Sequence, residues 1–336
     1  MAVRLKDIAL DLGVSVVTVS KVLRGNPDIG EATRKRVLDR MKELNYKPNM
    51  LARGLASGKT FTVGLVVPDL LQPYFAEFAK ALSGVLRASN RALILASSEE
   101  DPEVERQEIR TLLLRGVDVL ILASCQEELA EFFEPGDEPK PYLLFDRNFA
   151  GQQGSFVGSD DVKVGEIATT HLASLGRKRI AHIGATHISP AVDRLTGYRR
   201  ALAGLGHSVD EELVIVRHRL EERGDRIGFE AMRTLLALDQ RPDAVFCYND
   251  MTAMGAIEAA LQAGLRVPED IAIVGCGNFR YADYLRVPLS SVDHGTAELG
   301  RIAGEMALEL SDKKGTQPRK ALVEPRLVVR RSSGGS

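Results

Sequence analysis

Apolar residues recur at helical spacing in two short stretches at the start of the chain. The first stretch carries Leu5, Ile8, Ala9 and Leu12, and the second carries Val19, Val22 and Leu23. Each set falls on one face of an α-helix, so the pattern predicts two amphipathic helices that share an apolar seam. Gly13 suits the left-handed C-cap of the first helix, and Ser15 suits the N-cap of the second. Two short helices joined in this way form a helix-turn-helix.

The second helix has a side that takes no part in the seam. This side carries Val16, Val17, Thr18 and Lys21. Small and basic side chains on an exposed helix face suit insertion into the major groove of DNA. The alternative is an ordinary helical hairpin in a larger all-helical domain, which the remainder of the chain disfavours.

A third helix and a short connecting segment follow. The helix is predicted from about residue 30 to 44, with Ala32, Val37, Met41 and Leu44 facing inward. In the segment 47–60, Pro48 can begin a helix, but that helix would span about two turns and contain Gly54. Glycine weakens a helix by about 1 kcal/mol relative to alanine. The segment is therefore either a hinge that is helical only when something holds it or a flexible linker, and both interpretations remain open.

From residue 61 onward the pattern changes to short apolar runs that alternate with amphipathic helices. The runs lie at 61–68, 92–97, 117–124, 179–184, 243–248 and 270–275, and helices are predicted near 74–88, 103–115, 192–205 and 252–263. Near-continuous apolar strands that alternate with helices are typical of buried parallel sheets. About 270 residues exceed one doubly wound unit, so the pattern predicts two similar α/β lobes. A ligand is expected in the cleft between them, beyond the carboxyl ends of the strands.

Charge is distributed unevenly over an otherwise ordinary globular composition. Residues 1–60 contain 12 Lys and Arg against 6 Asp and Glu, a formal charge of +6, whereas the remainder carries −8. A basic head on an acidic body points to a polyanionic partner for the head alone. The chain has no secretory signal pattern and no apolar run as long as a membrane span, so a cytoplasmic location without membrane contact is expected.

Candidate chemistry for an enzyme is lacking in the sequence. The three cysteines, Cys125, Cys247 and Cys276, have neither metal-binding nor redox spacing, and we expect buried reduced thiols. The sequence contains no glycine-rich phosphate loop, no nucleophile elbow and no metal spacing among its six histidines. We expect no enzyme activity, no cofactor and no metal site.

Several separated motifs resemble the lactose/galactose-repressor (LacI/GalR) family of transcription regulators, in the same order and over essentially the whole chain. They include DIALDLGVSVVTVSKVLRG, YKPNMLARGL, VVPDLLQPYFAEF, LLFDR, HLASLGRKRIAHIG, RLTGYRRAL and YNDMTAMGAIEAALQAGLRVPEDIAIVG. The resemblance implies a three-helix helix-turn-helix head and a two-lobed body like that of periplasmic binding proteins, built on two doubly wound parallel sheets. The implied boundaries are 1–46 for the head, 47–60 for the hinge, 61–160 with 291–320 for lobe 1, and 161–290 with 321–336 for lobe 2.

The resemblance also implies a set of DNA-binding residues. Base-reading positions are Val16, Val17 and Lys21, and phosphate-contacting positions are Ser15, Thr18, Ser20, Asn26, Thr33, Tyr46 and Asn49, with Arg53 as a further DNA contact. The valines would contact thymine methyl groups, and Lys21 could donate to guanine O6 or N7. Leu55 occupies the position of the family's minor-groove wedge, which kinks the duplex. Packing of Leu55 between hinge and head is the alternative.

For the body, the resemblance implies a small effector bound between the lobes. The implied contacts are Gln72, Tyr74, Phe75, Ser124, Asp146, Asp161, Arg194, Arg223, Asn249, Gly277 and His294. Asp146 and Asp161 could equally be caps of helices or turns. Two positions depart from the pattern of sugar-responsive members: Gly277 stands where many have an acidic residue, and Arg223 stands near the place of an aromatic ring. A site with Arg194 and Arg223 could favour an anionic ligand over a neutral hexose.

The combined prediction is a homodimeric repressor that binds a palindromic double-stranded operator and responds to a small effector, a sugar or sugar derivative. The alternatives are a regulator of the same architecture with a nucleobase or another metabolite as corepressor, and a solute-binding protein. The direction of the effector's influence on DNA binding does not follow from the sequence.

Overall fold

The computed structural model describes residues 3–23, 26–46, 58–126, 140–149, 151–185, 188–217, 224–312 and 316–335. The chain divides into two compact units, Met1–Thr60 and Phe61–Ser336. Within the described ranges, no helix combines the length and apolar character that crossing a membrane requires.

The first unit is a bundle of three helices, α1 (Leu5–Leu12), α2 (Val16–Leu23) and α3 (Glu31–Glu43). Its core contains the predicted seam residues, buried as Ile8, Ala9, Val19, Val22, Val37 and Met41. Ala32 is exposed, contrary to the expectation that it faces inward. It precedes Val37 by five residues, which turns its side chain about 140° away from the core at 100° per residue.

The second unit contains two six-stranded sheets of matching topology. The first sheet consists of β1 (Thr62–Val67), β2 (Ala92–Ser97), β3 (Val119–Leu122), β4 (Tyr142–Phe145), β5 (Ser155–Ser159) and β11 (Lys320–Val323). The second consists of β6 (Ile180–Ala185), β7 (Val214–Arg217), β8 (Ala244–Cys247), β9 (Ala272–Cys276), β10 (Ser290–Asp293) and β12 (Arg326–Val328). Their orders, β2-β1-β3-β4-β5-β11 and β7-β6-β8-β9-β10-β12, are those of doubly wound sheets. All pairs are parallel except β10 with β12.

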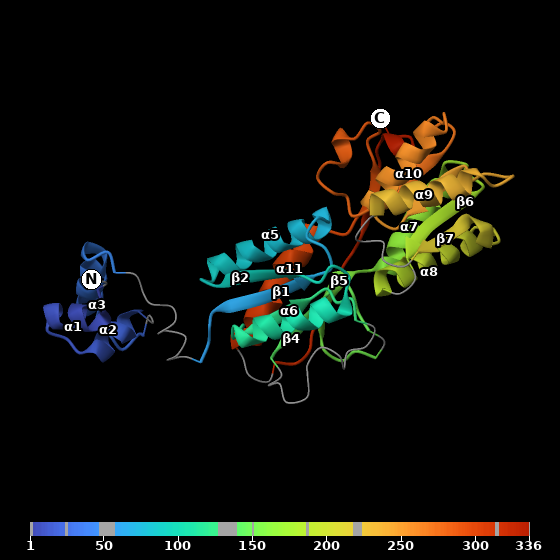
Figure 1. Ribbon diagram of the computed structural model, residues 1–336. Helices are drawn as coiled ribbons and strands as arrows, with labels where there is room; N and C mark the ends of the chain where they lie inside the picture. Colours follow the sequence, from blue (N-terminus) through green and yellow to red (C-terminus); the bar gives the residue numbers. More distant parts are fainter. Residues whose placement is uncertain are drawn as a thin grey trace. The chain divides into compact units, whose positions relative to one another are not determined.

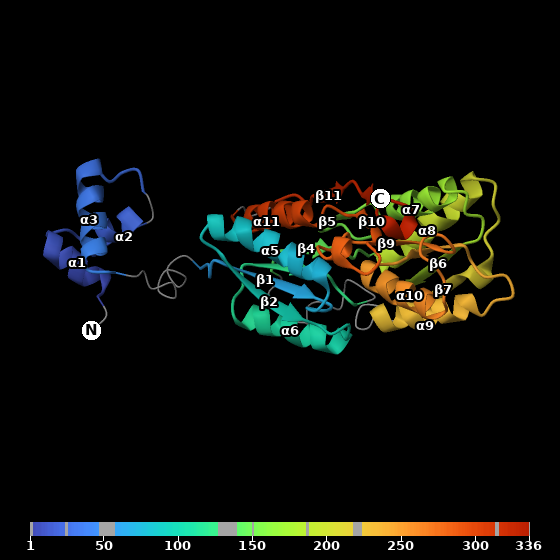
Figure 2. The same cartoon turned by 90° about the horizontal axis from the view of Figure 1, so that it is seen from above.

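Helices cover both faces of each sheet. In the first lobe, α5 (Pro73–Ala88) and α11 (Thr296–Asp312) lie side by side on one face, and α6 (Pro102–Leu114) covers the other (Figures 1 and 2). In the second lobe, α7 (Asp161–Ser174) packs with α8 (Ser189–Gly204), and α9 (Gly224–Leu236) packs with α10 (Asp250–Gln262). Short 3-10 helices lie at Glu211–Leu213, Ala282–Tyr284 and Arg331–Ser333. Successive residues of a strand point to opposite faces of the sheet, and they pack into a separate apolar core on each face.

The exchange of chain between the lobes differs from the predicted boundaries by a few residues. Ser290–Asp293 pairs with β9 in the second sheet, although lobe 1 was expected to resume at 291. Lys320–Val323 pairs with β5 in the first sheet, although lobe 2 was expected to resume at 321. The chain leaves the second sheet after β10 at Gly295, which has a left-handed φ of +69°. It leaves the first sheet after β11 at Pro325, which has no N–H to donate to a neighbouring strand.

Candidate functional site

The turn between α1 and α2 has the predicted caps. Gly13 adopts a left-handed φ of +65°, and its N–H donates to the carbonyls that end α1. The Ser15 hydroxyl accepts a hydrogen bond from the backbone N–H of Thr18 at 3.0 Å, and the two hydroxyl oxygens lie 2.9 Å apart. These contacts hold the start of α2 and occupy polar atoms of two residues that were predicted to contact phosphates.

The outward side of α2 is apolar at its beginning. The exposed fraction is 46% for Val16 and 61% for Val17, whereas Val19 and Val22 on the same helix are buried. Exposed valines on so short a helix add nothing to the core, but they suit contact with thymine methyl groups. The structure therefore leaves the two predicted apolar base-reading side chains accessible.

The third predicted base-reading residue, Lys21, has a charged partner that the sequence did not indicate. Its Nζ lies 2.5 Å from Oδ2 of Asp28, and both side chains are partly exposed. Asp28 follows Asn26-Pro27, a turn signal that returns the chain toward α2. This turn could have suggested the contact, but the seven-residue separation fits no helical pairing rule.

Part of the basic surface joins α3 to α1. Arg40 donates to Asp11 at 2.7 Å and to Glu43 at 2.9 Å. Arg36 donates to the carbonyl of Leu12 at 3.2 Å, which satisfies a terminal carbonyl of α1. The positive charge of residues 1–60 thus contributes to tertiary structure as well as to the surface potential.

The remaining predicted DNA contacts divide between described and undescribed residues. Ser20, Thr33 and Asn26 are partly exposed. Tyr46 packs against the head core, and its N–H donates to the carbonyl of Met41 at 2.9 Å. Asn49, Arg53 and Leu55, with positions 47–57 of the predicted hinge, lie outside the described residues.

A small cavity of about 30 Å³ lies between the two lobes of the second unit. Its lining comprises Gln72, Tyr74, Phe75, Asp146, Arg194, Tyr248, Asn249, Cys276, Gly277 and His294. Eight of the eleven predicted effector contacts are among these residues. Three of these eight, Asp146, Gly277 and His294, directly follow strands, and Asn249 is the second residue after β8. The carboxyl ends of strands are where side chains of parallel sheets converge. Tyr248 and Cys276 were missed, although each stands beside a predicted residue at a strand end.

Arg194 is the centre of this site and is almost completely buried. Its Nε donates to Asp161 at 2.7 Å and its Nη1 to the carbonyl of Tyr248 at 2.8 Å. Its Nη2 lies 3.4 Å from Nε2 of His294, and its guanidinium stacks on the Tyr248 ring at 4.6 Å. A buried guanidinium requires such partners, because an unpaired charge in a protein interior is strongly unfavourable.

Asp161 lies behind the cavity and serves Arg194 instead of lining the cavity itself. Burial, together with neighbouring Asp146, raises the pKa of Asp161 to about 7 against the opposing effect of Arg194. The N-cap of α7 is Asp160, whose carboxylate accepts from the N–H of Lys163. The alternative capping role therefore belongs to the preceding residue.

Asp146 does line the cavity. It has a left-handed φ of +65° and accepts a hydrogen bond from the Tyr74 hydroxyl at 2.9 Å. Burial raises its pKa, although Arg194 opposes the shift. Asp146 and Asp161 together place two carboxyl groups beside one guanidinium. The described residues therefore give no surplus of positive charge, and the expected preference for an anionic ligand gains no support from them. Arg223 lies outside the described residues.

Ser124 does not line the cavity, contrary to the prediction. Its hydroxyl donates to the buried carboxylate of Glu105 on α6 and accepts from the N–H of Gln126 at 3.0 Å. The backbone N–H of Cys125 donates to the same carboxylate at 2.7 Å. Glu105 and Ser124 both belong to lobe 1. The Ser124 hydroxyl is therefore bound by a residue of its own lobe.

The floor of the cavity contains a thiol and an imidazole in contact. Cys276 Sγ lies 3.1 Å from Nε2 of His294, and the Tyr74 ring packs 5.4 Å from the His294 ring. Burial raises the pKa of the Cys276 thiol and lowers that of His294 well below its ordinary value. Both groups are therefore neutral near pH 7, and they present hydrogen-bonding capacity without charge.

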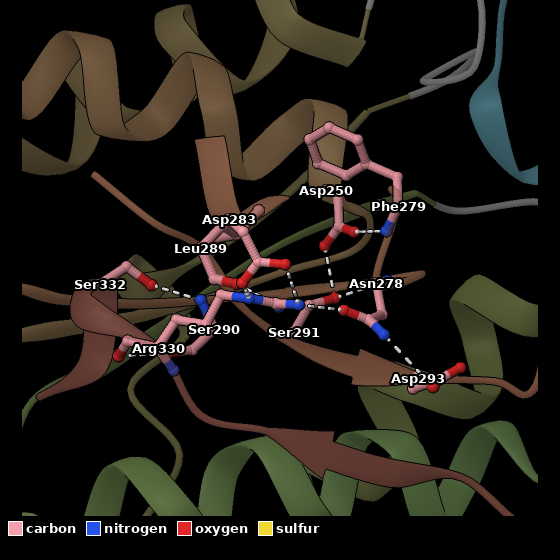
Figure 3. A network of polar contacts seen from close by, with 10 residues as sticks. All are labelled: Asp250, Asn278, Phe279, Asp283, Leu289, Ser290, Ser291, Asp293, Arg330 and Ser332. Atoms are coloured by element: carbon pink, nitrogen blue, oxygen red, sulfur yellow. Dashed lines mark hydrogen bonds and ion pairs between the residues drawn. The ribbon is translucent and has the colours of Figure 1, made fainter. Parts of the chain in front are cut away.

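The loop after β9 is held by a buried polar network (Figure 3). Asp250 accepts from the Ser291 hydroxyl at 2.6 Å and from the N–H of Phe279 at 2.9 Å. Asn278 donates its N–H to Ser291 at 2.8 Å and accepts from Arg330 at 2.9 Å. Gly277, in the same loop, has a φ of +122°, a conformation that other residues rarely adopt. This backbone conformation favours glycine over an acidic residue at the position.

Two family models match the sequence. Residues 4–49 match that of the bacterial regulatory proteins of the lacI family, and residues 169–333 match a periplasmic binding protein-like domain. These matches coincide with the three-helix unit and with most of the second lobe together with the returning α11.

Similar proteins cover nearly the whole chain. Catabolite control protein A of Priestia megaterium is 31% identical over 99% of this chain and 100% of its own length. The HTH-type transcriptional repressor PurR of Mannheimia succiniciproducens is 30% identical over 98% of each chain. The solved complex of the transcriptional regulator CelR with cellobiose has a TM-score of 0.73 and 30% identity, covering 98% of this chain and 100% of that one.

Proposed function

Because the chain belongs to the lacI family of bacterial regulatory proteins, we propose that it represses transcription from a palindromic operator under the control of a sugar-like effector. Its relatives are transcriptional regulators and not enzymes. The observation that carries the proposal is the exposed recognition surface of α2, formed by Val16, Val17 and Lys21. Apolar contacts and one cationic donor on a helix are suited to reading base edges in a major groove.

Effector binding is proposed to occur in the cavity around Arg194. Pockets for small ligands typically have volumes of about 300–1,000 Å³, at least about ten times the volume of this cavity. A ligand of that size must therefore widen the gap between the lobes. Since Tyr74 and Asp146 belong to one lobe and Tyr248 and Asn249 to the other, the ligand couples its own binding to the separation of the lobes.

The lining favours a neutral ligand with many hydroxyl groups. Asp146, Asn249, Tyr74 and His294 offer acceptors and donors at several positions, and Arg194 is already matched by carboxyl groups. Such a set can satisfy the alternating donors and acceptors of a sugar. The similar regulator CelR was solved in complex with cellobiose, a compound of this class. A nucleobase is the second candidate, since Tyr74 and Tyr248 provide aromatic faces for stacking.

A homodimer is proposed through a groove on the second lobe. This groove has a volume of about 450 Å³ and apolar walls formed by Phe229, Met254, Ile257, Leu261, Leu285 and Val287. Acidic Asp225 and Glu258 and basic Arg226 and Arg286 also line it. Both charge signs on one patch allow the patch to pack against its own copy about a two-fold axis. A two-fold dimer presents two copies of α2 to a palindromic site.

The test begins with a thermal-shift screen of neutral sugars, sugar acids, sugar phosphates and nucleobases against the full chain. Each hit is then added to DNA-binding titrations at constant salt, with an operator obtained by selection from random duplexes. We expect a neutral sugar to raise the unfolding temperature and to change operator affinity. Sequence-independent DNA binding would contradict the proposed regulator, and stabilisation by sugar phosphates alone would contradict the neutral effector.

A further inference from the structure

The ion pair between Lys21 and Asp28 lies on the surface that the proposed function assigns to DNA. Lys21 follows Val17 by four residues, so the two side chains share one face of α2. Nζ and Oδ2 are 2.5 Å apart, and both side chains are partly exposed. The polar part of the recognition surface is thus an ion pair, with the Lys21 ammonium bound to the Asp28 carboxylate.

The turn that carries Asp28 is anchored at its start, where both backbone polar groups of Asn26 are bound. The N–H of Asn26 donates to the carbonyl of Lys21 on α2 at 3.0 Å. The carbonyl of Asn26 accepts from Nη2 of Arg34 on α3 at 2.6 Å. The hydrogen bond from Lys21 lowers the pKa of Asp28, so the carboxylate is ionised at neutral pH. Asp28 is therefore a positioned anion in a surface that meets a polyanion.

An anion at this position repels phosphates, so phosphate binding does not account for its place on this surface. A lysine ammonium has three donors, and one bond to Asp28 leaves two. The carboxylate retains acceptor capacity after accepting from Lys21. The pair consequently offers two donors next to an acceptor.

We propose that Lys21 and Asp28 together read a single G·C base pair, with the ammonium donating to guanine and the carboxylate accepting from cytosine. In the major groove, guanine presents the acceptors O6 and N7 side by side, and the paired cytosine presents its N4 amino donor next to them. An A·T pair instead places its N6 donor between two acceptors. The inference rests on the proposed function, because it assumes that α2 enters the groove.

The experiment uses the full chain and the operator selected from random duplexes. Competition titrations with every single-base-pair variant of one half-site are carried out for the wild type, Lys21→Ala, Asp28→Ala, Asp28→Asn and the double alanine variant. We expect Asp28→Ala and Asp28→Asn to reduce the preference for G·C about tenfold at one position, the position where Lys21→Ala acts. The two alanine effects at that position should not be additive, because both break the same unit.

Asp39→Ala is the matched control, since it removes an exposed carboxylate of α3 from the same head. It should raise affinity for all duplexes alike and leave base preferences unchanged. Asp28→Asn keeps the side-chain size, which separates a reading role from a folding defect, and circular dichroism of each variant reports the fold.

If Asp28→Ala changed affinity in the same uniform way as Asp39→Ala, the paired reading would be wrong while the proposed function stood. The paired reading would also be overturned if Lys21 and Asp28 affected different base pairs. Failure of the wild type to enrich any sequence would overturn both the regulator and the inference.

Discussion

Buried titratable residues make the stability of this protein depend on pH. His182 on β6 is fully buried, and its ring packs 5.4 Å from that of Tyr198 and 4.9 Å from that of Phe246. Its Nδ1 lies 3.1 Å from the Phe246 carbonyl, whereas Nε2 has no hydrogen-bond partner among the described residues. Burial lowers the pKa of His182 to about 3. The folded protein therefore holds a neutral imidazole that the unfolded chain protonates near pH 6.5.

The unfolded chain takes up a proton at His182 below pH 6.5, whereas the folded protein does not. The contribution of His182 to the free energy of unfolding is therefore complete above pH 6.5 and falls as the pH decreases toward 3. We expect His182→Phe, which keeps an aromatic ring, to reduce the loss of unfolding free energy between pH 7 and 4.5 by about 2 kcal/mol. Urea unfolding at each pH measures this free energy. Circular dichroism is the suitable signal, because the chain has no Trp for fluorescence.

Asp161 and Asp250 act in the opposite direction, because burial raises their pKa values to about 7 and about 6. Their contribution is greatest below pH 3.8 and is lost as the pH rises through those values. They are present in both proteins, so the difference between wild type and variant isolates His182. Equal pH dependence of the two proteins would show that His182 is protonated or exposed in the folded state.

At the scale of elements, helix pairs of the second lobe approach through glycines. A Cβ on Gly197 of α8 would lie 1.9 Å from the carbonyl oxygen of Val162 on α7, and one on Gly165 would lie 2.1 Å from that of Arg194. In the other pair, a Cβ on Gly255 of α10 would lie 1.7 Å from the Asp225 carbonyl oxygen. These backbone-to-backbone contacts leave no room for a methyl group, so they set the distance between the helices.

We expect Gly197→Ala to lower the free energy of unfolding by about 3 kcal/mol, because the two backbones must separate. Since Arg194 lies one turn earlier on α8, the variant should also weaken effector binding. Gly204→Ala is the control: it lies on the same helix in open space and should be neutral or stabilising by up to about 1 kcal/mol. Comparable urea midpoints for the two variants would contradict this packing.

Most elements could be predicted from apolar periodicity, because each one buries a face of its own. The helices α3, α5, α6 and α10 begin and end within two residues of the predicted limits. The lobe exchange at β10 and β11 was misplaced, since each strand spans only four residues and its own sequence does not indicate which sheet it joins. β11 joins β5, where Lys320 pairs with Phe156, and β10 lies between β9 and β12. Such pairings between segments that are separated in the sequence are a relation that local periodicity does not carry.

At the scale of the whole molecule, Arg194 contacts two of the segments that connect the lobes. Asp161 stands where β5 gives way to α7, and His294 stands where β10 gives way to α11. Beside them, Asp293 pairs at 3.1 Å with Arg326, the first residue of β12, where the third connection ends. A ligand that engages Arg194 therefore acts where any change in lobe separation must occur.

We expect Arg194→Lys to retain operator binding and to lose the response to the effector identified by the thermal-shift screen. Lysine keeps the charge beside Asp161 but cannot reach three partners as the guanidinium does. The change of operator affinity caused by the effector should fall at least about tenfold in DNA titrations. Arg199→Lys is the control. Arg199 lies on the same helix as Arg194 and forms a surface ion pair with Glu211, so this variant should respond to the effector as the wild type does. An unaltered response of Arg194→Lys would remove Arg194 from the coupling.

The sequence by itself determined the three-helix head, the two α/β lobes and most side chains around the cavity. These features depend on local periodicity and on the rule that strand ends converge, both of which can be read along the chain. Tertiary structure decided the pairing of Lys21 with Asp28, the turning of Ser124 toward Glu105 and the use of Asp161 to hold Arg194. Each of these depends on which polar group lies nearest in space. A polar group that loses water on folding must take a partner from whichever element packs beside it, and only the packed fold determines that element.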